Sequence, residues 1–256
     1  MRLSEDNAIK VVTSGVQSQR AFSVKMDKMT YKLLSDNLYS DKVLAIVREY
    51  STNAADSNIA AGKATTPIQV HLPTRLEPWF SVSDDGLGLS HEDAMLIYPT
   101  YFESTKRDSD AVTGCFGLGC KAGFCYVDAF TVESRFNGIL RIYACAIDDG
   151  MPTISLLSKT HTNRPNGVEV KVPVANQDDI SVFKRSAESI LPWLNVPVNC
   201  NIETTVIRPK ANFKGESWAL YNTAPGQRGG LYINFGGVLY HIDENHLYNW
   251  SLENRS

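Results

Sequence analysis

The chain has 256 residues, of which 43% are hydrophobic and 21% charged, a composition typical of a soluble globular protein. Its formal net charge of −3 gives no electrostatic reason to expect nucleic-acid binding. No apolar stretch approaches the ~20 residues that span a bilayer, and the N-terminus lacks the apolar core of a signal peptide. The odd cysteine count of 5, with no CxxC pair, favours free thiols in a reducing cytoplasm over disulfides or a zinc site.

Hydrophobic spacing and turn residues predict most elements. In chain order they are strands at 9–12 and 21–24, helices at about 27–39 and 42–61, strands at 68–72 and 79–83, a short helix at 93–98, a helix beginning within 121–126, strands at about 127–135, 139–147, 153–158 and 167–173, a helix at 179–194, and a hairpin over 230–240. Asp41 is a predicted N-cap, and Gly62 ends the helix that follows it. Many strands with few helices after residue 127 favour an α+β two-layer sandwich, with a mixed, mostly antiparallel sheet and helices on one face.

The composition changes near residue 196, where asparagine, proline and aromatic residues become more frequent. We therefore expect one domain over residues 1–195 and the beginning of a second over 196–256, in a chain that is part of a longer protein.

Three polar residues share one face of the predicted helix at 42–61. Glu49, Asn53 and Asp56 stand at positions i, i+4 and i+7. A carboxylate one turn from a carboxamide suits a general base beside a ligand for Mg²⁺. An isolated pattern of this kind is more often a solvated helix face.

A tight turn with two aspartates follows the predicted strand at 79–83. Glycines at 86 and 88 would let a ligand approach the backbone, and a carboxylate here can accept a hydrogen bond from the exocyclic amine of a base. We assign this role to Asp84, which sets the D-x-G-x-G register, although Asp85 leaves an ambiguity of one residue. An ordinary Asp-Gly turn is the alternative.

The segment Gly114-Cys115-Phe116-Gly117-Leu118-Gly119-Cys120-Lys121 has neither the spacing of a Walker A loop nor that of a dinucleotide fingerprint. A glycine-rich turn that leads into a helix still offers N–H groups and a positive dipole end to phosphate. Lys121 and Lys106 could add charged contacts.

The order of these segments resembles the GHKL ATPase superfamily of gyrase B, Hsp90, histidine kinases and MutL, over about residues 40–173. The resemblance implies a Bergerat-type ATP-binding fold that binds ATP and Mg²⁺, with Glu49 activating the hydrolytic water, Asn53 binding Mg²⁺, and residues 97–113 acting as a lid that closes over the nucleotide. The complete set of nucleotide-binding residues that it implies is Asn53, Asp56, Asp84, Gly86, Gly88, Lys106, Gly114, Phe116, Gly117, Leu118, Gly119, Lys121 and Val168. One departure is Gly167-Val168, where the superfamily usually has Gly-Thr, so the hydroxyl that supports adenine recognition is missing.

The chain also resembles, nearly from end to end, the N-terminal part of bacteriophage rIIA proteins. Arg48-Glu49, Ser104-Thr105-Lys106, the glycine segment, Arg228-Gly229-Gly230-Leu231-Tyr232 and the stretch 236–243 carry this resemblance. It implies a transducer-like second domain and a phage protein in the cytoplasm of the infected bacterium. The family is linked with lysis inhibition, and its full-length members with the membrane.

Three functions remain open. The first is an ATPase switch that hydrolyses ATP slowly in this fragment and promotes dimerisation or binding of an unknown host or phage protein. The second is a histidine-kinase domain, disfavoured because those domains lack a glutamate at the position of Glu49. The third is a non-catalytic module that binds a host protein through a degenerate nucleotide pocket, which the Val168 departure supports.

Overall fold

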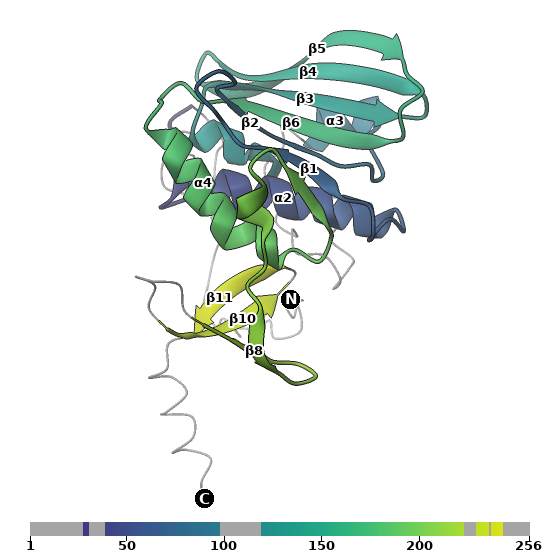
Figure 1. Cartoon of the computed structure of the whole chain (residues 1–256). Helices are drawn as coiled ribbons and strands as arrows, with labels where there is room; N and C mark the ends of the chain where they lie inside the picture. Colours follow the sequence, from purple (N-terminus) through teal and green to yellow (C-terminus); the bar gives the residue numbers. More distant parts are fainter. Residues whose placement is uncertain (1–27, 31–38, 98–118, 223–228, 236, 243–256) are drawn as a thin grey trace, which may run out of the picture.

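The computed structural model describes residues 28–30, 39–97, 119–222, 229–235 and 237–242 (Figure 1). Its helices are α2 (Lys42–Ala60), α3 (His91–Ile97) and α4 (Asp179–Ile190), with the short 3₁₀ helices η2 (Gly119–Cys125), η3 (Leu191–Trp193) and η4 (Glu203–Val206). The strands are β1 (Ile68–His71), β2 (Trp79–Ser83), β3 (Ala129–Phe136), β4 (Ile139–Asp148), β5 (Met151–His161), β6 (Gly167–Pro173), β7 (Val198–Cys200), β8 (Ala211–Lys214), β9 (Ala219–Tyr221), β10 (Leu231–Phe235) and β11 (Val238–Ile242). The predicted strands at 9–12 and 21–24, and most of the predicted helix at 27–39, lie outside the described residues.

The main sheet has 7 strands in the order β5-β4-β3-β6-β2-β1-β7. Every neighbouring pair is antiparallel except β1 and β7, which run parallel. The prediction of a mixed, mostly antiparallel sheet is therefore confirmed. Because β7 lies beyond residue 195, the sheet extends slightly past the expected domain boundary, and the division into two domains stays a prediction.

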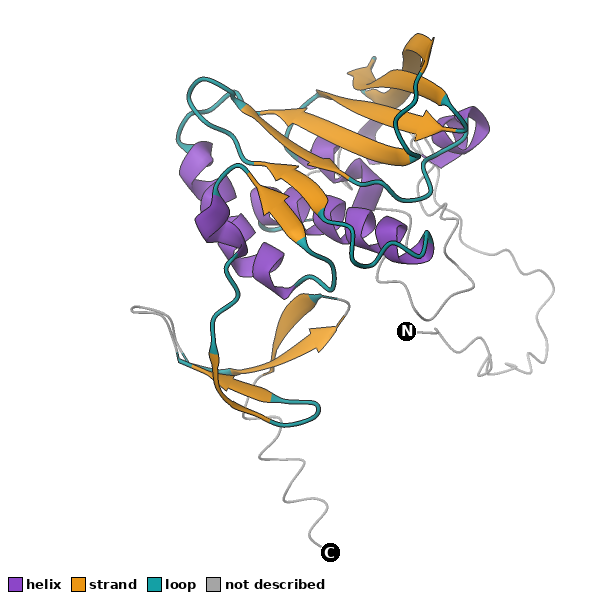
Figure 2. Ribbon diagram, turned by 45° about the vertical axis from the view of Figure 1, so that its right-hand side comes forward, coloured by secondary structure: helices purple, strands orange, loops and turns teal. Residues whose placement is uncertain are grey.

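The core lies between the sheet and α2 and α4, which cover one of its faces (Figures 1 and 2). Alternating side chains of neighbouring strands build the buried face, as in the register partners Val70 and Val82, and Val82 and Val170. Phe183 of α4 stacks on Phe80 of β2 with ring centroids 5.3 Å apart. The two-layer α+β fold is confirmed.

Helix α2 begins and ends where its sequence predicts. The side chain of Asp41 accepts a hydrogen bond from Leu44 N at 2.9 Å, and Gly62 adopts a φ of +71° just after the helix. Its apolar stripe is buried, including Ile46 and Val47. Some of its polar residues are buried too, so this helix must hold polar groups inside the fold.

Two hairpins, β8–β9 and β10–β11, lie apart from the main sheet (Figure 1). The predicted hairpin over 230–240 is confirmed, with Gly237 at a φ of +86° in its turn. Trp193 ties both hairpins to the end of η3: its ring packs edge-on against Tyr221, and its carbonyl accepts from Asn234 at 3.3 Å.

Candidate functional site

The structure brings Glu49, Asn53 and the end of the glycine segment together. A side chain at Gly119 would place its Cβ 2.6 Å from Glu49 Oε2 and 3.3 Å from Asn53 Nδ2. Glu49 Oε1 accepts hydrogen bonds from Arg48 Nε at 3.2 Å and Nη2 at 2.9 Å. One carboxylate oxygen is thus held by Arg48, while the other faces Gly119.

Asp84 lies at the end of β2 and is only 5% exposed. Its Oδ1 accepts hydrogen bonds from Gly86 N at 2.8 Å and Ser57 Oγ at 3.0 Å. Burial raises the pKa of this carboxyl from 3.8 to about 6, although the two donors, the Val168 backbone and the Arg135 charge favour the ionised form. A buried carboxylate that is ionised near neutral pH is a strong acceptor for a ligand N–H group.

Glycines at the turn let three segments meet. A Cβ at Gly86 would overlap Ser57 of α2, one at Gly88 would overlap the Arg135 carbonyl, and one at Gly167 would overlap the Asp84 carbonyl. Gly88 also has a φ of +71°. The glycines therefore serve the close packing of the protein's own backbone, and the ligand roles of Gly86 and Gly88 stay predictions.

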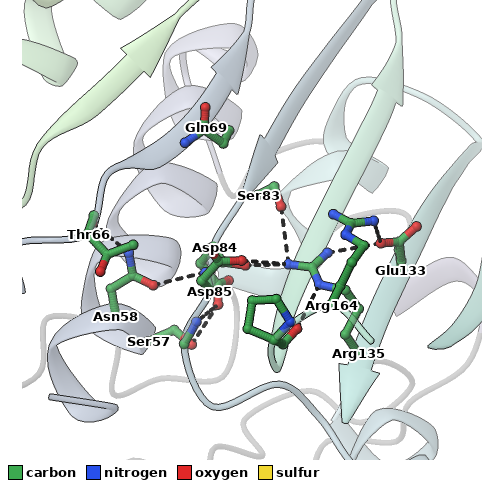
Figure 3. A network of polar contacts seen from close by, with 12 residues as sticks. Ser57, Asn58, Thr66, Gln69, Ser83, Asp84, Asp85, Glu133, Arg135 and Arg164 are labelled. Carbon is green, nitrogen blue, oxygen red and sulfur yellow. Dashed lines mark hydrogen bonds and ion pairs between the residues drawn. The ribbon is translucent and has the colours of Figure 1, made fainter. Parts of the chain in front are cut away.

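Sequence reasoning missed the residues that hold the turn in place (Figure 3). Asn58 Oδ1 accepts from Asp85 N at 3.0 Å, while its Nδ2 donates to Thr66 O at 2.9 Å. Ser57 stands at i+8 from Glu49, so extending the predicted polar face of α2 by one position would have found it, whereas Asn58 at i+9 falls on the opposite side of the helix.

Arg135 is a second residue of this region that the sequence did not predict. It is only 1% exposed. It donates to the Asp84 carbonyl at 2.5 Å, to Pro165 O at 3.1 Å and to Glu133 Oε1 at 2.9 Å, and it lies 3.4 Å from Asp85 Oδ1 (Figure 3). One side chain from β3 therefore joins the turn after β2 to the loop before β6. No local pattern around residue 135 signals this role.

Part of this chain matches known proteins. Residues 42–167 match the family model described as histidine kinase-, DNA gyrase B- and HSP90-like ATPase. The chaperone protein HtpG of Polaromonas sp. (strain JS666) is 30% identical over 129 residues, which cover 42% of this chain and 20% of HtpG. The comparisons therefore support a GHKL-type ATPase domain.

Solved structures of ATPase regions resemble the fold of this chain. The ATPase region of Saccharomyces cerevisiae topoisomerase II matches with a TM-score of 0.50 at 19% identity, over 62% of this chain and 47% of that one. The same region bound to ICRF-187 (dexrazoxane) matches equally well. The chain thus spans about half the length of these structures and a fifth of HtpG, and at this identity the structures bear on the fold alone.

The glycine segment is described only from Gly119 onward. Lys106, Gly114, Phe116, Gly117 and Leu118 lie outside the described residues, so their roles stay predictions. The predicted helix after them is a 3₁₀ helix of 7 residues.

In the structure, Lys121 and Val168 make contacts within the protein. Lys121 is 2% exposed, and its Nζ donates to Cys120 Sγ at 3.2 Å, so a phosphate contact would require this side chain to move. Val168 is half-buried against the core, and its carbonyl accepts from Asp84 N at 2.9 Å. Their ligand roles, and that of the buried Asp56, stay predictions.

Tyr50 fixes η2 to α2. Its hydroxyl donates to Cys120 O at 3.3 Å and accepts from Gly123 N at 2.8 Å. The ring lies buried beside Phe130, with centroids 6.3 Å apart. The distance between Glu49 and Gly119 is therefore set by a buried contact one residue along the helix.

Two cavities lie among the described residues, and the second of them borders Arg48, which binds Glu49 Oε1. One of about 370 Å³ is lined by Leu191, Leu194, Val206 and Arg208, among others. Another of about 230 Å³ lies at the start of α2, between Tyr39 and Arg48. Neither is lined by Asn53 or Asp84. No described helix has the length and apolar character needed to cross a membrane.

We predict that Gly119→Ala impairs catalysis more than folding. The new Cβ would press on the far end of the Glu49 side chain, which can rotate away at little cost to the fold. ATP hydrolysis should fall by about tenfold or more, because the carboxylate leaves its position. The free energy of unfolding, measured in urea, should change by less than about 1 kcal/mol. Gly167→Ala is the contrast, since its Cβ meets the Asp84 backbone and should destabilise the fold.

Asp84→Asn should stabilise the protein above pH 6. The folded state must ionise a buried carboxylate whose pKa is about 6, against 3.8 in the unfolded chain, so stability is lost as pH rises between these values. The full shift corresponds to roughly 3 kcal/mol. We therefore expect Asp84→Asn to gain up to about that much at pH 8 and nothing near pH 4, as measured by urea unfolding across this range. A variant less stable than wild type at pH 8 would contradict the assigned burial cost.

Proposed function

We propose that this domain binds ATP with Mg²⁺ and hydrolyses it slowly, with closure of residues 97–113 over the nucleotide as the switch. The observation that carries the proposal is the position of Glu49 and Asn53 directly against Gly119. The proposed base and the proposed metal ligand, one turn apart on α2, thus lie beside the end of the proposed phosphate-binding segment, which comes much later in the chain.

The residues fit ATP and Mg²⁺. Gly119 lacks the side chain that would fill the space beside Glu49 and Asn53, as a loop that approaches phosphates requires. Asn53 would hold Mg²⁺ through Oδ1 after a half-turn of its amide group, because Nδ2 is the atom that lies beside Gly119 in this structure. Mg²⁺ takes few protein oxygens and completes its shell with phosphates and water. When bound, the metal would neutralise developing charge on the phosphates.

The protein's own residues supply the remaining chemistry. Glu49 Oε2 faces the glycine segment and would accept the proton of the attacking water, while Arg48 prevents Oε1 from turning away. Asp84 would accept a hydrogen bond from the exocyclic amine of adenine. Gly86 and Ser57 support this, because their hydrogen bonds orient the carboxylate.

A single-turnover assay separates this proposal from the non-catalytic alternative. With enzyme in excess over radiolabelled ATP, we expect ADP and phosphate to appear slowly and in equal amounts. Binding without any turnover would favour the interaction module, which the apolar Val168 also supports. Transfer of the label to a histidine would instead favour a kinase.

The wider biological role rests on sequence resemblance. We propose that the chain is the N-terminal part of a phage rIIA-like protein, acting during infection on a host or phage partner.

Nucleotide-dependent dimerisation is the expected mode of switching. Sedimentation of Glu49→Ala with ATP should show a dimer that is absent without nucleotide, whereas a monomer under both conditions would contradict the switch.

A further inference from the structure

The Ser57 hydroxyl lies directly against the Asp84 carboxylate (Figure 3). It donates its proton to Oδ1 at 3.0 Å and accepts a hydrogen bond from Leu87 N at 3.2 Å. A hydroxyl has only one proton, so the bond from Leu87 fixes which way it points. Ser57 is thus held as a donor toward Asp84.

The hydrogen bond from Ser57 determines which oxygen of the Asp84 carboxylate remains available to a ligand. Among the described residues, both hydrogen bonds to the Asp84 side chain fall on Oδ1, from Ser57 and from Gly86. Oδ2 therefore retains the capacity to accept a hydrogen bond from a ligand. Val168, whose carbonyl accepts a hydrogen bond from Asp84 N, has an apolar side chain and cannot offer a hydroxyl to a ligand.

Close packing keeps Ser57 in this position. A Cβ at Gly86 would overlap both the hydroxyl and the backbone of Ser57, so α2 and the turn are in direct contact there. Asn58 is the next residue, and its Oδ1 accepts a hydrogen bond from Asp85 N at 3.0 Å. The end of α2 is therefore attached to the turn at two consecutive residues.

We propose that Ser57 is a positioning residue for purine selection: its hydroxyl holds Asp84 so that Oδ2 accepts a hydrogen bond from the 6-amino group of adenine. The inference rests on the proposed ATP site and goes beyond it, because it names the residue that makes the site prefer a 6-amino purine. A 6-oxo purine offers a carbonyl where adenine offers N–H, and two acceptors facing each other repel.

The test compares ATP with inosine triphosphate, which differs in carrying the 6-oxo group, in wild type and Ser57→Ala. We expect ATP affinity to fall about tenfold in Ser57→Ala, while inosine triphosphate affinity changes by less than about twofold. The pH at which ATP affinity is half lost should also move upward, because a donor that favours ionised Asp84 is removed.

Ser51→Ala is the matched control on the same helix. Its Oγ is buried and finds no hydrogen-bond partner among the described residues, so both affinities should stay at wild-type values. Equal losses for the two nucleotides in Ser57→Ala, with an unmoved pH profile, would show a merely structural hydroxyl and overturn the inference. A wild type that binds neither nucleotide would overturn the proposed function itself, and the inference with it.

Discussion

In Glu49→Ala, ATP hydrolysis should fall by about 10²- to 10⁴-fold while ATP binding persists. The carboxylate is the group that faces Gly119, where the phosphates are expected, and removal of a general base acts on the chemical step. Steady-state turnover and calorimetric binding, measured on the same preparation, separate the two effects. The kcat should drop with little change in nucleotide affinity.

The control for this experiment is Glu188→Ala. Glu188 is an exposed glutamate on α4 whose contact with Lys184 spans 3.9 Å, so its loss should leave hydrolysis unchanged. If Glu49→Ala retains wild-type turnover, the assigned base is wrong, even if the domain binds ATP.

Arg135→Met should lower the free energy of unfolding by about 3 kcal/mol or more. The guanidinium is 1% exposed and donates to a buried carbonyl, a loop carbonyl and a carboxylate, all of which would lose a partner. A methionine fills a similar volume but satisfies none of them. Urea unfolding of the variant measures the loss.

Arg164→Met gives a matched comparison at the same carboxylate. Arg164 also donates to Glu133 Oε1 at 2.9 Å, but its side chain is 55% exposed, so its removal should cost only ~0.5 kcal/mol. Equal stability of the two variants would contradict the view that Arg135 secures the Asp84 turn.

Local pattern was enough to predict much of the fold and part of the site. The apolar stripe and caps of α2 depend on neighbours within a few residues, and the spacing of Glu49 and Asn53 follows from the helical repeat. The strands at 68–72 and 79–83 were likewise predicted from local pattern, and the structure has them at Ile68–His71 and Trp79–Ser83.

Contacts across the chain could not be predicted in this way. Arg135 is separated by 51 residues from the Asp84 carbonyl that it binds, and β3 looks like an ordinary strand. The burial of Lys121 depends in the same way on how η2 packs against α2. The role of a buried polar residue depends on partners that are distant in the sequence and that only the fold brings close.

The most direct test of an ATP site at Asp84 is calorimetric titration of ATP and Mg²⁺ into wild type and Asp84→Asn at pH 8. We predict binding by wild type and a loss of about 10- to 100-fold in the variant, since a hydrogen bond to a charged group is removed. Because Asp84→Asn is expected to be at least as stable as wild type at this pH, its urea unfolding curve checks that the loss does not come from unfolding. Absence of ATP binding by wild type, or equal binding by both proteins, would contradict the account.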